Sequence, residues 1–177
     1  ARYDVTTYGR PSHAGLQLSE GRSAIRKMAE KIIDIEAMTS EDCSFSVGVM
    51  QAGKWVNCVS SKASAEVLSM SKRQEDLDDG IARMLEHNDP DGEVITKVKL
   101  GLTRPVWTPS TAGLKLVELA NDLATQLGQP FRHESSGGGS DGNFTGAMGV
   151  PTLDGLGVAG DKYHTLEEHI EIDSLAM

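Results

Sequence analysis

The feature that most limits the possible folds of this chain is the order in which two apolar periods alternate along its first 100 or so residues. Apolar residues recur at every second position in four segments, residues 2–8, 44–49, 55–67 and 94–100, which predicts four strands. Two segments with helical spacing lie between them, residues 25–36 and 74–88. The order β-α-β-β-α-β is typical of a ferredoxin-like domain, with two helices on one face of a four-stranded antiparallel sheet. We therefore expect an α+β fold with this domain at residues 1–104.

The first predicted helix has the clearest amphipathic pattern. Its apolar residues are three or four positions apart: Ile25, Met28, Ala29, Ile32 and Ile35. Residues at this spacing share one face of a helix, so we expect these side chains to pack on the sheet. Ser23 or Ser19 is expected to cap the helix, because a serine hydroxyl accepts a hydrogen bond from a free amide of the first turn.

The composition changes beyond Pro105. One more helix is predicted at residues 114–127, and nine of the 19 glycines lie between Gly137 and Gly160. Glycine at this density is typical of tight turns and close backbone approach. The clearest β-like run is short, residues 150–153. Because the segment holds too few apolar residues for a core of its own, we expect residues 105–177 to be an incomplete domain.

Charge and cysteine content exclude several classes of protein. The net charge is -9, and no basic patch for nucleic acid is visible. No apolar run approaches the length that spans a bilayer, so we expect no membrane segment. The two cysteines, Cys43 and Cys58, fall on predicted neighbouring strands, and we expect reduced, partly buried thiols. The residues leave the cellular compartment open.

Three polar loops contain residues that could carry chemistry. The first, residues 9–15, holds His13 between a strand and a helix. The second, residues 136–143, has consecutive glycines whose amides could bind an anion or a developing oxyanion. The third, residues 160–169, has His164 followed by a threonine and two acids, a pattern that suits a metal ligand. Taken singly, each has an ordinary structural interpretation, as a solvated histidine, a linker or a capped turn.

Taken together and in this order, the loops resemble one family. The motifs are R-P-S-H-A-G at 10–15, S-G-G-G-S-D at 136–141, P-T-L-D-G-L-G at 151–157 and H-T-L-E-E at 164–168. They resemble the glutamate carboxypeptidase and aminoacylase group of dinuclear zinc hydrolases, peptidase family M-twenty. The resemblance covers essentially the whole chain, and P-T-L-D-G-L-G is most similar to the glutamate carboxypeptidase branch.

The resemblance implies a lid domain that forms a homodimer and a catalytic domain that binds two zinc ions. His13 matches a lid histidine that reaches across the dimer and hydrogen-bonds the scissile carbonyl oxygen. Asn57 matches a substrate-binding lid asparagine, and His164 matches a C-terminal zinc ligand. The substrate-contacting glycine loop corresponds to Gly137, Gly138 and Gly139. The implied reaction is hydrolysis of an amide bond in a small peptide or an N-acyl amino acid.

The family's other metal ligands have no counterpart in this sequence. The one match to its His-x-Asp motif is His87-Asn88-Asp89. This match ends a predicted helix before Pro90, so we expect a helix end and a turn there. The one match to its Glu-Glu pair is Glu167-Glu168, which follows His164, where the family has an acid of its own. Because a catalytic zinc needs three protein ligands, we expect the isolated chain to be inactive and to be cut at both ends.

A second departure concerns the substrate. Relatives carry an arginine for a substrate carboxylate near the end of the third lid strand, where this sequence has Met70. Lys72, two residues on, could replace it if the strand contains a bulge. Specificity for a C-terminal glutamate is therefore not implied by this position.

Two other interpretations stay open. Residues 138–142 fit G-x-S-x-G, and Asp154 and His164 follow in the order of a serine α/β-hydrolase. That motif needs a buried apolar strand before the serine, whereas the residues before Ser140 are mostly polar. The other interpretation is a non-catalytic dimerisation or binding module that is retained for its interface.

Overall fold

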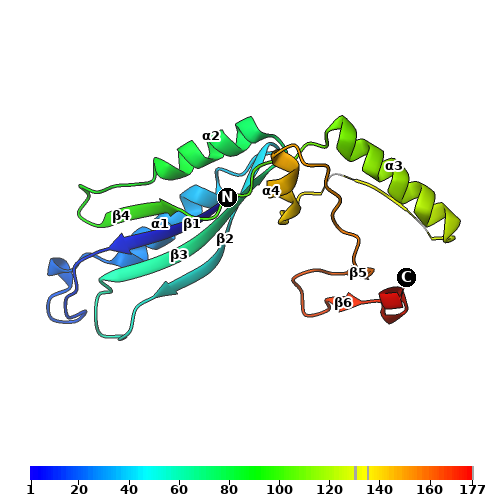
Figure 1. Ribbon diagram of the computed structural model, residues 1–177. Coiled ribbons are helices and arrows are strands. Elements are labelled where there is room, and N and C mark those ends of the chain that lie inside the picture. Colours follow the sequence, from blue (N-terminus) through cyan, green and yellow to red (C-terminus); the bar gives the residue numbers. More distant parts are fainter. Residues whose placement is uncertain (130, 135, 177) are drawn as a thin grey trace. The chain divides into compact units, whose positions relative to one another are not determined.

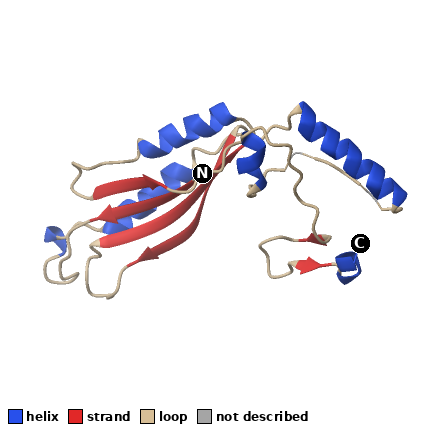
Figure 2. Ribbon diagram, viewed as in Figure 1, coloured by secondary structure: helices blue, strands red, loops and turns tan. Residues whose placement is uncertain are grey.

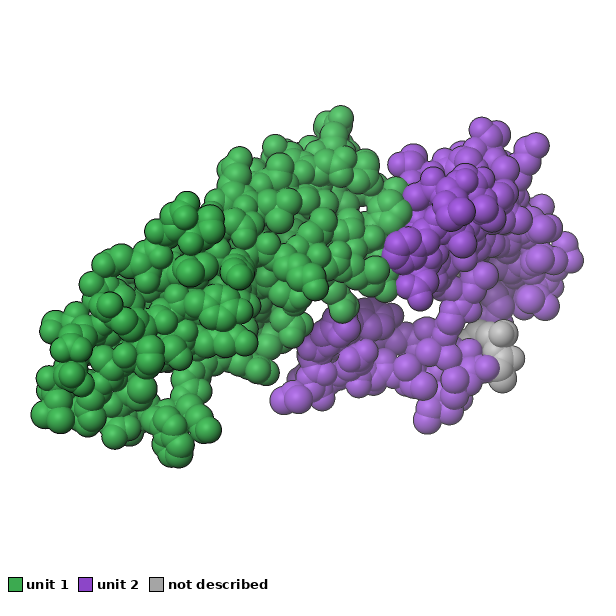
Figure 3. All heavy atoms as spheres, turned by 60° about the vertical axis from the view of Figure 1, so that its left-hand side comes forward, with its two compact units in different colours: residues 1–107, 135–139 green, residues 108–134, 140–177 purple. Residues whose placement is uncertain are grey.

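The structure is a computed structural model that describes residues 1–129, 131–134 and 136–176. The chain divides into two compact units (Figure 3), residues 1–107 with 135–139 and residues 108–134 with 140–177. The first unit has the element order β1-α1-β2-β3-α2-β4 (Figure 1). These elements span Arg2–Tyr8 (β1), Ala24–Glu36 (α1), Cys43–Ala52 (β2), Lys62–Ser71 (β3), Gln74–Leu85 (α2) and Ile95–Leu100 (β4).

The four strands form one antiparallel sheet in the spatial order β2-β3-β1-β4. Helices α1 and α2 contribute to the same buried core and cover one face of the sheet (Figure 2). Each helix joins two strands that follow each other in the sequence but are not neighbours in the sheet: α1 joins β1 to β2, and α2 joins β3 to β4, as in a ferredoxin-like domain. The predicted α+β fold class is therefore confirmed.

The core occupies the helix-covered face of the sheet. On β1, Tyr3, Val5 and Thr7 are buried, because alternate residues of a strand point to the same face. Two buried hydroxyls find partners: Tyr3 Oη lies 2.9 Å from Ser69 Oγ, and Thr7 Oγ1 donates to the carbonyl oxygen of Ala24 at 2.8 Å. The apolar cluster contains Tyr3, Val5, Ala24, Met28, Ile35, Cys43, Phe45, Ala63, Ala65, Val67, Met84 and Val98.

Helix α1 begins one residue earlier than the sequence predicted, and its buried stripe is shifted. Ser23 is the N-cap, and its hydroxyl accepts a hydrogen bond of 3.1 Å from the Arg26 amide. Ala24, Met28 and Ile35 are buried, whereas the predicted core residues Ile25 and Ala29 are exposed. Each residue turns the helix by about 100°, so a core face that starts at 24 leaves residue 25 at its flank.

The third strand is shorter than predicted. The segment 53–61 is a loop, and Gly53 at its start has φ +72. Its amides and carbonyls bond to other segments: the Val59 amide donates to the Ser12 carbonyl, and the Ala24 amide to the Ser60 carbonyl, each at 2.9 Å. Cys58 is therefore exposed in a loop, and the prediction that it lies on a strand is wrong. Cys43 on β2 is buried, and this burial raises the pKa of its thiol.

The second unit contains little regular structure. Its elements are α3 (Thr111–Gln126), α4 (Gly142–Ala147), β5 (Gly160–Asp161), β6 (His169–Ile170) and a final 3₁₀ turn, Ile172–Ala176. Helix α3 starts before its predicted position because the Ser110 hydroxyl caps it, accepting from the Gly113 amide at 3.1 Å. The predicted β-like run at 150–153 is not a strand. Within the described residues, no helix is long and apolar enough to cross a membrane.

Candidate functional site

The loop that carries His13 joins β1 to α1 and closes on itself. The backbones of Arg10 and Arg22 form an antiparallel bridge with two hydrogen bonds of 2.9 Å. A Cβ atom at Gly9 would overlap the carbonyl oxygen of Arg22, so glycine is required where the two ends of the loop meet. A short 3₁₀ turn, Leu18–Glu20, lies within the loop. His13 is therefore presented on a closed loop of defined shape.

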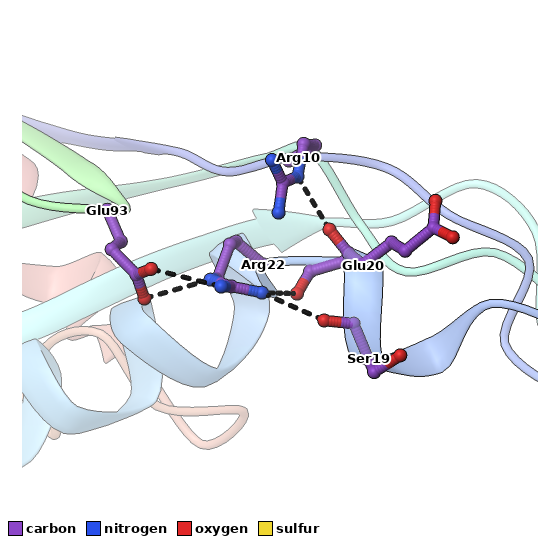
Figure 4. A network of polar contacts seen from close by, with 6 residues as sticks. Arg10, Ser19, Glu20, Arg22 and Glu93 are labelled. Carbon is purple, nitrogen blue, oxygen red and sulfur yellow. Dashed lines mark hydrogen bonds and ion pairs between the residues drawn. The ribbon is translucent and has the colours of Figure 1, made fainter.

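Two arginines fasten the base of this loop (Figure 4). Arg10 Nε donates to the Glu20 carbonyl at 2.6 Å. The Arg22 guanidinium bonds both carboxylate oxygens of Glu93, at 2.8 and 3.0 Å. Glu93 precedes β4, so this pair joins segments that are 71 positions apart in the sequence. The hydrogen bond and the charge of Glu93 raise the pKa of Arg22, and Arg22 lowers the pKa of the Glu93 carboxyl in return.

The imidazole of His13 is held in one tautomer. Its Nδ1 accepts hydrogen bonds from the backbone amides of Gly15 at 3.1 Å and Leu16 at 3.2 Å. A backbone amide can only donate, so Nδ1 carries no proton in the neutral ring and Nε2 does. The side chain is exposed. His13 therefore offers an Nε2–H donor to whatever approaches the loop, while the ring is uncharged.

The structure brings Asn57 to the same place as His13. The Ala14 amide donates to the Asn57 carbonyl oxygen at 3.0 Å, and His13 and Cys58 face each other in an isolated antiparallel bridge. Beside them, residues 53–55 and 58–62 line a hollow of about 290 Å³. No periodicity or local motif predicted that these two loops meet. The family resemblance was the one signal that linked the two residues.

The glycine loop is exposed. Gly137, Gly138 and Gly139 all have exposed backbones, and a Cβ at Gly139 would lie 3.4 Å from Arg104 Cδ. The Gly138 amide already donates to the Ser136 hydroxyl at 3.0 Å, so in this arrangement it is not available to a substrate oxygen. The loop supplies backbone that a ligand can approach closely.

His164 lies in the turn between β5 and β6. It has φ 64, and Lys162 has φ 59, so two non-glycine residues of this turn are in the left-handed region. The His164 amide donates to the Glu168 carboxylate at 3.1 Å, and Glu167 pairs with Lys162. Glu167 and Glu168 thus shape the turn. Residues other than glycine rarely adopt the left-handed region, so the backbone of His164 is held there by the surrounding turn. His164 is also the residue that the resemblance assigns to zinc.

The His-x-Asp look-alike is structural. The Asn88 side-chain oxygen accepts from the Val98 amide at 2.9 Å and ties the end of α2 to β4. His87 Nδ1 lies 3.3 Å from Lys31 Nζ, and Asp89 pairs with Lys27 at 3.6 Å. These contacts account for all three residues without a metal. Among the described residues, no three histidine, cysteine or acidic side chains are grouped to hold an ion, so His164 alone does not provide a zinc site.

The geometry also disfavours a serine nucleophile at Ser140. Its hydroxyl accepts a hydrogen bond from the Gly142 amide at 3.1 Å. A hydrogen bond from Ser140, followed by one from the Gly155 amide, lowers the pKa of Asp154. The serine is thus bonded directly to the carboxylate, whereas a catalytic triad places a histidine between them. Ser140 instead precedes and stabilises the turn into α4.

A family model described as a peptidase dimerisation domain matches residues 1–93. The chain belongs to the M-twenty peptidase family. In this M-twenty chain, the matched residues include strands β1, β2 and β3, helices α1 and α2, and the loops that carry His13 and Asn57. Membership of a metallopeptidase family gives the serine hydrolase interpretation no support.

Relatives match almost the whole chain. The uncharacterised protein YqjE of Bacillus subtilis is 26% identical over 179 residues, covering 99% of this chain and 48% of that protein. Carboxypeptidase G2 of a Pseudomonas species is 25% identical over 185 residues, covering 99% of this chain and 44% of the enzyme. The crystal structure of a tripeptidase from Staphylococcus aureus superimposes with a TM-score of 0.77 at 25% identity, covering 99% of this chain and 47% of that one. The chain therefore spans just under half the length of these relatives.

Proposed function

We propose that this chain is the lid and part of the catalytic domain of a metal-dependent peptidase or amidohydrolase. The substrate is a small peptide or N-acyl amino acid, and cleavage is of the carboxypeptidase type. Support comes from the dimerisation-domain match and from the likeness to carboxypeptidase G2, whose name states its class of activity. The likeness to a tripeptidase also favours small peptides over folded proteins.

The observation that carries this proposal is the fixed tautomer of His13. The Gly15 and Leu16 amides occupy Nδ1, so Nε2–H can donate to a substrate carbonyl oxygen as negative charge develops on it. A neutral donor held by the backbone needs no reorganisation during the reaction. Loss of one such donor costs about 2.7–4 kcal/mol of transition-state stabilisation in a hydrolase. His13 would supply this bond to the active site of the partner subunit.

Substrate binding is assigned to Asn57 and to Gly137, Gly138 and Gly139. Asn57 lies beside His13, so both can contact the same substrate group. His164 is assigned as one metal ligand, with zinc as the expected ion. The described residues do not complete a zinc site, so the other ligands would come from outside this chain, and the isolated chain would be inactive.

The boundary near residue 104 separates the lid from part of the catalytic domain. The buried apolar side chains of the described chain lie between Tyr3 and Val98. Helix α3 exposes several leucines along its length, Leu114, Leu119 and Leu123, with exposed fractions of 46%, 54% and 49%. An amphipathic helix with its apolar residues in solvent is expected to pack on further structure. Residues 105–177 therefore form a portion of a larger domain.

The homodimer is assigned to the edge formed by β2 and α1. Strand β2 is an edge of the sheet and contacts α1. Ile33 on α1 is 70% exposed, and Met50 on β2 is 43% exposed. Met50 pairs with the buried Ala65, so it points to the helix-covered face, next to α1. A second copy placed against this edge would cover these apolar side chains and pair the free strand.

The test is the replacement His13→Ala in the protein that contains all the metal ligands. We expect kcat to fall by about 100- to 1,000-fold, with a smaller effect on KM, because the bond forms as charge develops. His133→Ala removes another exposed loop histidine and serves as the control. Chelators should abolish the activity, and serine-directed reagents should leave it intact. A His13→Ala enzyme with unchanged kcat would refute the assignment.

A further inference from the structure

A single guanidinium connects the His13 loop to the segment before β4. Arg22 bonds both oxygens of Glu93, and its Nη1 donates to the carbonyls of Ser19 at 3.1 Å and Gly21 at 2.8 Å (Figure 4). Its N–H groups thus join a carboxylate on one segment to two backbone oxygens on another. A bidentate arginine–carboxylate pair fixes direction as well as distance.

The contacts of Arg22 reach His13 in two steps. Gly21, whose carbonyl Arg22 holds, packs so closely on Ser12 that a Cβ at position 21 would overlap the Ser12 hydroxyl. Ser12 precedes His13, and its carbonyl accepts from the Val59 amide at 2.9 Å. On the other side, the Gln17 amide donates to the His13 carbonyl at 3.0 Å. The backbone on both sides of His13 is therefore tied to the segment that Arg22 fastens.

The ion pair lies at the surface. The side chains of Arg22 and Glu93 are 32% and 76% exposed. Surface ion pairs contribute little to global stability, because solvent screens them. A contact that adds little stability yet joins the His13 loop to the segment before β4 acts mainly by placing the loop.

We propose that Arg22 is a positioning residue that fixes the location and tautomer of the His13 imidazole, with Glu93 as its anchor. This inference rests on the proposed role of His13 as a donor. Without the guanidinium, the Ser19 and Gly21 carbonyls are no longer tied to Glu93, and the loop can separate from the segment before β4. The Gly15 and Leu16 amides then lose their fixed approach to Nδ1.

Three variants test this inference: Arg22→Met, Glu93→Gln and the control Arg26→Met. Arg26 lies in the first turn of α1, outside the loop, and pairs with Glu30 at 3.1 Å on the exposed side of the helix. The first readout is the pair of ¹⁵N resonances of the His13 ring in this chain. The second is kcat and KM in the protein that contains all the metal ligands.

In Arg22→Met we expect the His13 nitrogen resonances to move toward each other as both tautomers become populated. We also expect kcat to fall by about 10- to 100-fold, with KM changed much less, because a small displacement of a catalytic group has effects of this size. Glu93→Gln keeps one acceptor oxygen and should give a smaller change in the same direction. It also provides the test if Arg22→Met does not fold. Arg26→Met should match the wild type.

Wild-type His13 resonances in both Arg22→Met and Glu93→Gln would overturn the inference. So would an equal change in Arg26→Met. Moved resonances with unchanged kcat would support the positioning role of Arg22 and refute the catalytic role of His13, so the two failures are distinguishable.

Discussion

The backbone amide of Ala14 donates a hydrogen bond of 3.0 Å to the carbonyl oxygen of Asn57. This bond joins the loop after β1 to the loop before β3, which are more than 40 positions apart in the sequence. Because of it, the exposed imidazole of His13 and the segment that carries Asn57 form one surface. The candidate site is therefore built by two loops that hydrogen-bond to each other.

The tautomers of two histidines should be opposite. Backbone amides occupy Nδ1 of His13, which places its proton on Nε2. In His169, Nδ1 lies 2.9 Å from the Glu167 carbonyl oxygen, an acceptor, so Nδ1 must carry the proton. A long-range ¹H–¹⁵N spectrum of the neutral rings distinguishes the two forms. The same tautomer in both rings would contradict one of these two assignments.

The proposed dimer edge can be tested with one charged substitution. Ile33→Glu places a carboxylate at the proposed β2–α1 edge, where burial against a second copy would desolvate it. We expect the variant to sediment as a monomer under conditions in which the wild type is a dimer. Leu68→Glu is the matched control, because Leu68 is 41% exposed on β3 and points away from the helices. A dimeric Ile33→Glu protein would place the interface elsewhere.

The isolated chain of 177 residues should bind zinc weakly. His164 is the one ligand that the family assignment gives it, and the described residues contain no cluster of three candidate ligands. Calorimetric titration should therefore detect no zinc binding tighter than about 1 μM, since tight sites need three or four protein ligands. His164→Ala should leave the titration unchanged. Tight binding that His164→Ala abolishes would show that the chain builds a metal site by itself.

Protonation of His87 should reduce stability in mildly acidic solution. Burial, and then the nearby Lys31 ammonium, lower the pKa of His87 in the folded protein, against smaller opposite effects of Asp34 and Glu86. As the pH falls below the usual value of 6.5, the unfolded chain therefore takes up a proton before the folded one does. The contribution of His87 to stability is complete above that pH and is lost as the pH falls through the folded pKa.

The measurement is the free energy of unfolding in urea at about pH 7.5 and about pH 5, for the wild type and for His87→Gln. The wild type should lose more stability between the two conditions than the variant, which has no group to titrate at this position. Equal losses in the two proteins would show that His87 does not cause the acid sensitivity.

Local patterns predicted most of the fold of the first unit. Alternating residues such as Val5 and Thr7 marked β1, and Ser23 was one of two predicted caps for α1, because period and capping depend only on neighbouring residues. The predictions that failed are those that depended on distant partners. Ile25 fits the helical spacing of the predicted core residues, yet it lies at the exposed flank of α1. Trp55 lies in a loop, although the alternation in its segment predicted a strand.

The sequence by itself therefore determined the order of elements in the first unit and its fold class, and its resemblance to the family supplied the candidate residues His13, Asn57 and His164. Only the tertiary structure decided that the His13 and Asn57 loops meet, which nitrogen of His13 carries its proton, and that Arg22 reaches Glu93. The physical reason is how far apart in the sequence the interacting residues lie. Helix and strand periods arise from contacts a few residues apart, whereas loop placement and tautomer are fixed by hydrogen bonds between segments that folding brings together.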